Sequence, residues 1–205
     1  SSSRTYRKSS PAMATQGDVE RFEPLQQFCG GAVVRGIKEI LGVQFRNMAT
    51  MGGSVASKFG FSDIIPALLA VHADIVTYKG GRMSMKDYMN YRERDILVEI
   101  RIPKREVPVA VEALRISRGD FPYLTGSIRR DDTAYEVYIG TRPGAPQLAE
   151  KASALLSEKG LDALDEAAQI ASEELVYQKN SHASKEYRIE MAKAMVRRLV
   201  KEVAQ

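Results

Sequence analysis

The sequence predicts an α+β protein made of two compact units. Segments rich in β-branched residues, which read as strands, lie on both sides of a charged stretch with two prolines at 103–108. Long helical patterns then fill the last third of the chain, and strands followed by helices are typical of α+β units. The 205 residues are enough for two small cores. We therefore expect a first unit over residues 1–104 and a second over residues 105–205.

The amino-acid composition argues against several classes of protein. Apolar residues make up 44% of the chain and charged residues 27%, as in ordinary globular domains. The longest apolar run, 64–71, is far shorter than the roughly 20 residues that cross a bilayer, so we expect no membrane span. The start of the chain does not read as a secretory signal, so we expect a cytoplasmic protein.

Metal and nucleic-acid sites are disfavoured by the same composition. One cysteine and two histidines provide no ligand cluster, so we expect no metal site within this chain. The net charge is +4, but basic residues gather without acids only at Arg4, Arg7 and Lys8. A nucleic-acid-binding module is therefore the weakest of the alternatives, and no nucleic-acid partner is expected.

The first unit is expected to be mainly helical, with two strands. Residues 1–20 are polar and read as a loop or tail, and 22–41 reads as a helix broken near Gly30 and Gly31. The glycine-containing stretch 43–61 reads as a shaped loop. The remaining expected elements are a helix starting at Ser62–Asp63 and ending near 72–73, strands over 74–78 and 96–102, and a short helical turn over 85–91.

The second unit is expected to be a three-stranded antiparallel sheet followed by a helical bundle. Two of its strands are joined by the turn residues Asp131 and Asp132. The expected strands are 109–117, 123–130 and 133–139, and the expected helices are 147–158, 163–175 and 184–203.

One stretch carries the pattern of a binding site. In Thr50-Met51-Gly52-Gly53-Ser54, the paired glycines would let backbone amides approach a phosphate, and the two hydroxyls would add donors. Asp63, nine residues further on, could cap its own helix or accept hydrogen bonds from a ribose. A paired glycine in a loop is often only a turn, so the residues alone leave a diphosphate site and a plain turn both open.

Resemblance to a known family favours the diphosphate site. The stretch 46–54 (Arg-Asn-x-Ala-Thr-x-Gly-Gly-x) with 62–68 (Ser-Asp-Ile-x-Pro-Ala-Leu) resembles the second FAD motif of the flavin subunits of molybdenum hydroxylases, the xanthine dehydrogenase and carbon monoxide dehydrogenase relatives. The strand at 95–103 and the segment 114–118 also resemble that family. The resemblance covers about residues 32–205. It implies an FAD-binding (PCMH-type) α/β domain followed by a C-terminal domain of the CO dehydrogenase flavoprotein type.

The resemblance also implies a cofactor site. Thr50, Met51, Gly52, Gly53 and Ser54 would hold the FAD diphosphate. Asp63 would contact the ribityl or ribose part, and Leu97 would lie near the flavin or adenine. Arg115 stands near the position where the family often has a lysine. Since a flavin carries the redox chemistry itself, no catalytic side chain is expected.

The family implies partners as well. A molybdenum-pterin subunit would oxidise a substrate, a subunit with 2Fe-2S clusters would carry the electrons, and FAD would pass them to NAD or another acceptor. A homodimer is left open. Two departures stand out: Ser54 replaces the family's usual Asn or Asp, and the first glycine-rich motif, of the Ala-Gly-Gly-Thr type, is not found. A flavin-free assembly or interaction protein of the same fold is therefore the rival hypothesis.

Overall fold

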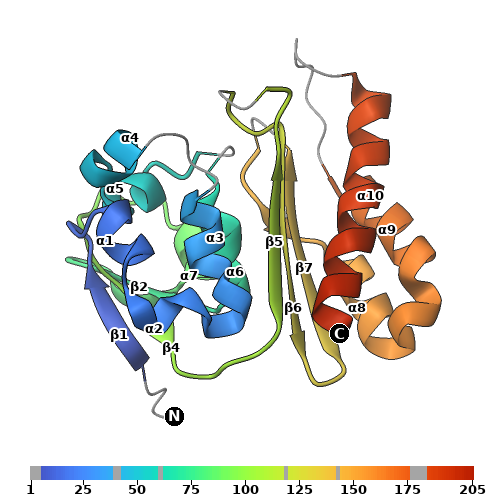
Figure 1. Cartoon of the computed structure of the whole chain (residues 1–205), viewed down its shortest axis with the longest axis horizontal. Helices are drawn as coiled ribbons and strands as arrows, with labels where there is room; N and C mark the ends of the chain where they lie inside the picture. The colour runs from blue at the N-terminus through green and yellow to red at the C-terminus, as the bar shows by residue number, and fades with distance from the viewer. Residues whose placement is uncertain (1–5, 39–42, 60–61, 118–119, 142–143, 176–183) are drawn as a thin grey trace.

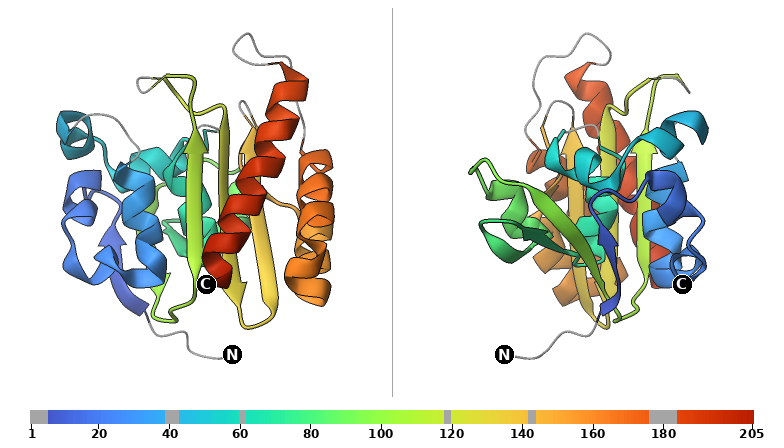
Figure 2. Two further views of the ribbon diagram at one scale, coloured as in Figure 1. Left: turned by 45° about the vertical axis from the view of Figure 1, so that its right-hand side comes forward. Right: turned by 90° about the vertical axis from the view of Figure 1, so that its left-hand side faces the viewer.

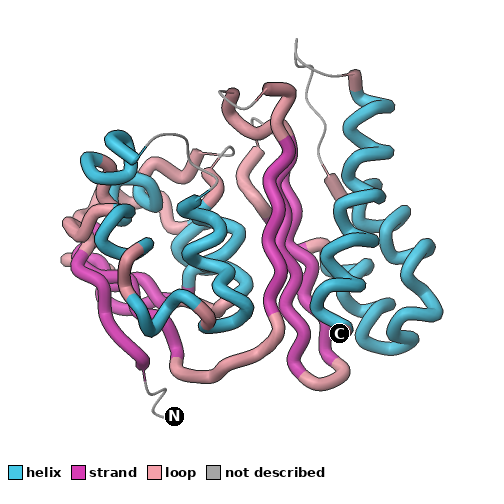
Figure 3. Tube along the Cα trace, viewed as in Figure 1, coloured by secondary structure: helices cyan, strands magenta, loops and turns pink. Residues whose placement is uncertain are grey.

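The computed structural model describes residues 6–38, 43–59, 62–117, 120–141, 144–175 and 184–205. They form two antiparallel sheets, with strand orders β1-β4-β2-β3 and β5-β6-β7-β8. The first sheet is surrounded by short helices, and the second is covered on its far face by the three last helices (Figures 1 and 3). The α+β class and the order of strands and helices in the second half are confirmed.

The first half contains more regular structure than the sequence indicated. Its elements are strands β1 (Tyr6–Pro11), β2 (Asp74–Thr77), β3 (Gly81–Ser84) and β4 (Leu97–Pro103), and helices α1 (Gln16–Glu20), α2 (Glu23–Gln26), α3 (Ala32–Lys38), α4 (Val43–Met48), α5 (Met51–Ala56), α6 (Ile64–Ala70) and α7 (Met85–Asn90), with a 3-10 turn at Phe28–Gly31.

The prediction of a loop or tail over residues 1–20 is wrong for residues 6–20, and residues 1–5 lie outside the described part of the chain. Strand β1 pairs with β4, and α1 begins at a capping box in which the Thr15 hydroxyl accepts from the Asp18 amide. The Asp18 carboxylate accepts from the Thr15 amide in return. The polar composition of this segment hid a strand whose hydrogen bonds come from a partner about 90 residues away in the sequence.

The prediction of a shaped loop over 43–61 is also wrong for residues 43–59, because they contain α4 and α5, whereas residues 60–61 lie outside the described part. Met51, Gly52 and Val55 of α5 are buried, so tertiary packing overrides the low helix propensity of adjacent glycines. The predicted break near Gly30 is confirmed, since Cys29 and Gly30 have positive φ. In β4, the side chain of Leu97 is buried and that of Val98 is exposed. A bulge in β4, opposite Val76 and Thr77, shifts the alternation of buried and exposed side chains along the strand.

The second half is a meander with helices on one face. Its elements are β5 (Val109–Leu114), β6 (Leu124–Asp131), β7 (Ala134–Thr141), β8 (Gln147–Leu148), α8 (Glu150–Lys159), α9 (Leu164–Glu173) and α10 (Lys185–Ala204), with a 3-10 turn at Gly160–Ala163. The short fourth strand occupies residues that the sequence assigned to the start of a helix. The core of the second half combines β6 and β7 with α8, α9 and α10.

Helix α6 joins the two halves by lying against the near face of the second sheet (Figure 2). Alternate residues of β6 face it: the Ser127 hydroxyl donates to the Pro66 carbonyl at 2.7 Å, and Arg129 donates to the Ala70 carbonyl at 3.3 Å. On the same side, His72 Nε2 lies 2.6 Å from the Glu136 carboxylate. These polar contacts fix the rotation of α6 on the sheet.

Two kinds of feature are absent from the described residues. No helix there is both long and apolar enough to cross a bilayer. Among the same residues, no group of three or more His, Cys, Asp or Glu side chains is arranged to hold a metal ion.

Candidate functional site

The predicted glycine motif forms the first turn of α5. Thr50 is the N-cap residue, and its hydroxyl accepts from the Gly53 amide at 3.0 Å. Met51 is 1% exposed, so its side chain anchors the turn in the core of the first half. Five predicted site residues, Thr50 to Ser54, are therefore positioned by a capped helix start.

Backbone hydrogen bonds from the loop between β1 and α1 hold this turn against β4. The Met51 amide donates to the Ala14 carbonyl at 2.9 Å, and the Gly52 amide donates to the Ala12 carbonyl at 2.8 Å. The Ala12 amide in turn donates to the Val98 carbonyl at 2.9 Å. The turn, the loop and the start of β4 therefore form one connected backbone network.

The two glycines have different roles. A Cβ on Gly52 would lie 2.6 Å from the Ala12 Cβ and 2.7 Å from the Ala12 carbonyl oxygen, closer than real side chains come. Gly53 is exposed, and a Cβ there would meet only the Thr50 hydroxyl oxygen at 3.0 Å. Gly52 is therefore required by the close approach of the loop, whereas Gly53 faces outward.

The backbone amides of this turn are already engaged. Met51 and Gly52 donate to the loop carbonyls, Gly53 donates to the Thr50 hydroxyl, and the Ser54 amide donates to the Thr50 carbonyl at 3.2 Å. The amides are therefore not arranged as a diphosphate cradle in this structure, and the assignment of Thr50 to Ser54 to the diphosphate stays a prediction. A backbone nest needs amides that point at the ligand.

Two hydroxyls remain as donors. Thr50 Oγ1 accepts from Gly53, and Ser54 Oγ accepts from Gln16 Nε2 at 2.6 Å, but within the described residues neither hydroxyl donates its own proton. Both side chains are half-buried. Gln16 is 1% exposed, and its Oε1 atom has no partner among the described residues. Thr50 and Ser54 therefore fit a phosphate or ribityl oxygen through their side chains.

The structure brings Asp63 and Arg115 together. Arg115 Nη2 lies 2.5 Å from Asp63 Oδ1, and the side chains are only 11% and 7% exposed. Asp63 occupies the N-cap position of α6 without a side-chain cap bond. The neighbouring Ser62 hydroxyl instead accepts from the Ile65 amide at 3.4 Å. The pair thus joins the first half to the segment after β5.

Leu97 lies near the turn but does not face outward. It begins β4 next to Val98, whose carbonyl holds Ala12, and its side chain is only 8% exposed. Any contact that Leu97 makes with a ligand would therefore involve its backbone or the edge of its side chain.

Sequence reasoning missed the contribution of the loop before α1. Ala12 fixes Gly52, and Gln16 holds the Ser54 hydroxyl. One signal was present: Thr15 followed three residues later by Asp18 is a capping box, which marks the start of a helix rather than a tail.

Comparisons with known proteins identify the family of the chain. The family model described as the FAD binding domain in molybdopterin dehydrogenase matches residues 7–105. The model described as the CO dehydrogenase flavoprotein C-terminal domain matches residues 110–203. The match therefore begins at residue 7, and the narrower extent expected from the sequence, from about residue 32, is corrected.

The curated relatives are distant in sequence. The uncharacterized protein YgfM of Escherichia coli K12 is 26% identical over 118 residues, which are 57% of this chain and 46% of that protein. The chain thus spans about half the length of the curated relatives it matches.

Two solved enzyme structures share the fold. Quinoline 2-oxidoreductase from Pseudomonas putida 86 superposes with a TM-score of 0.85 at 20% identity, over 96% of this chain and 74% of that one. Carbon monoxide dehydrogenase from Hydrogenophaga pseudoflava superposes with a TM-score of 0.83 at 22% identity, over 98% and 77%. Together the two family models match nearly all of the chain, which belongs to the family of FAD-binding subunits of the molybdenum hydroxylases.

Proposed function

We propose that this chain is the FAD-binding electron-transfer subunit of a xanthine dehydrogenase-like molybdenum hydroxylase in the cytoplasm. It would receive electrons from the 2Fe-2S clusters of one partner, which are reduced by a molybdenum-pterin partner, and deliver them to NAD or another acceptor. The matches at 7–105 and 110–203 support a division into an FAD-binding domain, 1–104, and a C-terminal domain, 105–205. The observation that carries the proposal is the turn held by the loop before α1, whose two hydroxyls donate to no acceptor among the described residues.

Each residue of the proposed site has a separate task. Thr50 and Ser54 would donate hydroxyl protons to the diphosphate or to the ribityl chain. Met51 and Gly52 would fix the position of these donors, through a buried side chain and through contact with the loop before α1. Gly53 would leave the approach to the turn open, since it is exposed and has no side chain.

Asp63, Arg115 and Leu97 would define the other walls of the site. The Asp63 carboxylate, held in place by Arg115, would accept from a ribose or ribityl hydroxyl. Leu97 would contribute a backbone or apolar contact at the start of β4. When bound, FAD would supply the electron-transfer chemistry that amino-acid side chains lack.

Titration of the protein with FAD, followed by quenching of flavin fluorescence, tests the assignment. Replacing Thr50 with Val or Ser54 with Ala should weaken FAD binding by about tenfold or more, because each loses a hydrogen bond to a charged or strongly polar group. Thr50→Ser should retain binding, since it keeps the hydroxyl and the cap. Thr133→Val, in the exposed β6–β7 turn, is the matched control. Unchanged affinity in both Thr50→Val and Ser54→Ala would overturn the hydroxyl assignment.

The engaged amides favour a second candidate, a flavin-free assembly or interaction protein of the same fold. All four amides from Met51 to Ser54 already have protein acceptors, so the turn is complete without a ligand. This candidate predicts that folded wild-type protein takes up no FAD at any concentration tested. Saturable flavin binding that depends on Thr50 would reject it.

A further inference from the structure

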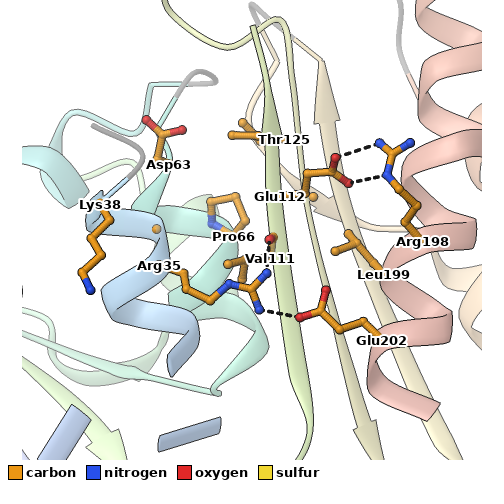
Figure 4. Close-up of a pocket in the computed structure, with 13 residues that line it drawn as sticks. Arg35, Lys38, Asp63, Pro66, Val111, Glu112, Thr125, Arg198, Leu199 and Glu202 are labelled. Atoms are coloured by element: carbon orange, nitrogen blue, oxygen red, sulfur yellow. Dashed lines mark hydrogen bonds and ion pairs between the residues drawn. The ribbon is translucent and has the colours of Figure 1, made fainter. Parts of the chain in front are cut away.

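A hollow lies along β5 at the edge of the second sheet, between helices α3 and α10 and beside the start of α6 (Figure 4). Its volume is about 530 Å³, which is large enough for a small organic molecule. Its apolar surface comes from Pro66, Val111 and Leu199. Of the proposed flavin-site residues that the structure describes, only Asp63 also lines this cleft.

Thr125 supplies an unused polar group in the cleft. Thr125, Ser127 and Arg129 are alternate residues on the face of β6 toward α6, and the last two each donate to an α6 carbonyl, Pro66 or Ala70. Helix α6 begins only at Ile64, so no further turn of the helix faces Thr125. Its hydroxyl is buried, with the residue 1% exposed, and has no hydrogen-bond partner among the described residues. Buried hydroxyls are normally hydrogen-bonded, which points to a ligand.

The charges around the cleft are nearly all neutralised by each other. Arg35 pairs with Glu202 at 2.5 Å, across the cleft between α3 and α10. Arg198 holds Glu112 through two contacts, at 2.7 and 3.3 Å.

Asp63 pairs with Arg115, so its charge is also compensated. Lys38, which is exposed on α3, is the lining cation for which the described part of the chain provides no acid. The cleft therefore carries a small positive excess around an apolar wall.

We propose that this cleft is a binding site for a small organic monoanion with a flat apolar body, such as an aromatic carboxylate. The body lies against Pro66 and Val111, on the same face of the sheet as Thr125. The carboxylate accepts from the buried Thr125 hydroxyl and is attracted by the cationic edge at Lys38. A buried hydrogen bond to a charged group outweighs attraction by an exposed lysine, so Thr125 contributes most of the selectivity.

Ligand-observed NMR and calorimetry with benzoate and its neutral analogue benzamide test the proposal on the full chain. We expect saturable benzoate binding, weaker at high salt, and clearly weaker binding of benzamide. Thr125→Val should weaken benzoate binding by about tenfold, and Lys38→Met by about two- to fivefold. Thr133→Val and Lys104→Met, both at exposed positions away from the cleft, are matched controls and should bind as the wild type does.

Each possible outcome either supports or contradicts the proposal. Loss at Thr125 and Lys38 with intact controls supports the site, and far-ultraviolet circular dichroism shows whether each variant is folded. Absence of benzoate binding at millimolar concentration, equal binding of benzamide, or unchanged binding in Thr125→Val each overturns the proposal. FAD affinity measured on the same variants is an independent readout, since neither Thr125 nor Lys38 belongs to the proposed flavin site.

Discussion

Replacing the two adjacent glycines one at a time should have opposite consequences. In Gly52→Ala, the new Cβ would lie 2.6 Å from the Ala12 Cβ and 2.7 Å from its carbonyl oxygen, so the loop must move. In Gly53→Ala, the new Cβ would meet only the Thr50 hydroxyl oxygen, at 3.0 Å. The structure thus predicts one damaging and one tolerated substitution in neighbouring positions of the same helix.

The magnitudes follow from the contacts that change. Overpacking at Gly52 costs about 1–3 kcal/mol. Loss of the 2.8 Å hydrogen bond to Ala12 adds about 0.5–1.5 kcal/mol. The helix propensity of alanine returns at most about 1 kcal/mol at either position. We therefore expect Gly52→Ala to destabilise by about 2 kcal/mol and Gly53→Ala to change the free energy of unfolding by less than about 1 kcal/mol.

Urea unfolding followed by circular dichroism measures both changes, and FAD titration of the same proteins reports the site. Gly52→Ala should also weaken FAD binding, because the displaced loop carries Gln16, which holds the Ser54 hydroxyl. Equal costs in the two variants, or a larger cost for Gly53→Ala, would refute the packing role assigned to Gly52. A loss of FAD binding in Gly53→Ala with unchanged stability would instead support an amide role for that residue.

Three further predictions concern the junction between the halves. Asp63→Ala should destabilise by about 3–5 kcal/mol in chemical denaturation, because it leaves Arg115 buried without its carboxylate. Ser127→Ala should cost about 1 kcal/mol by the same measurement, through loss of its buried hydrogen bond. Burial alone would raise the pKa of Glu136, but hydrogen bonds from His72 and a neighbouring tyrosine outweigh it and hold the pKa below its ordinary value of 4.5. The stability from this carboxylate is therefore present above pH 4.5 and lost as the pH falls below it, and thermal unfolding of Glu136→Gln should lack that part of the acid dependence.

The sequence predicted the second half well because its local patterns agree with its packing. Strands β5 to β7 are consecutive and antiparallel, so each one pairs with a neighbour in sequence. Helix α10 begins where Ser184 caps it, as the pattern of 184–203 indicated. Strand β8 was missed, since two residues are too short to show a period.

The first half was harder to predict because its structure depends on distant partners. Strand β1 pairs with β4 across most of the unit, and no local pattern reveals such a pairing. Helix α5 contains two glycines, which argue against a helix when propensity is considered alone. The buried side chains of Met51 and Val55 decide the outcome, and their burial is visible only in the fold.

The motif at 50–54 stays a predicted site, and the structure changes which of its atoms can donate to a ligand: the hydroxyls of Thr50 and Ser54 rather than the backbone amides. A glycine pair suggested exposed amides, yet the amides of Met51 and Gly52 hold the loop before α1. The glycine that looked like a ligand contact is a spacer that lets Ala12 approach, and this approach places Gln16 against Ser54. Hydroxyl donors held by such a network are fixed before a ligand arrives, so binding need not order them. It follows that the loop at 12–16 should influence flavin affinity without touching the flavin, which makes it a positioning element of the site.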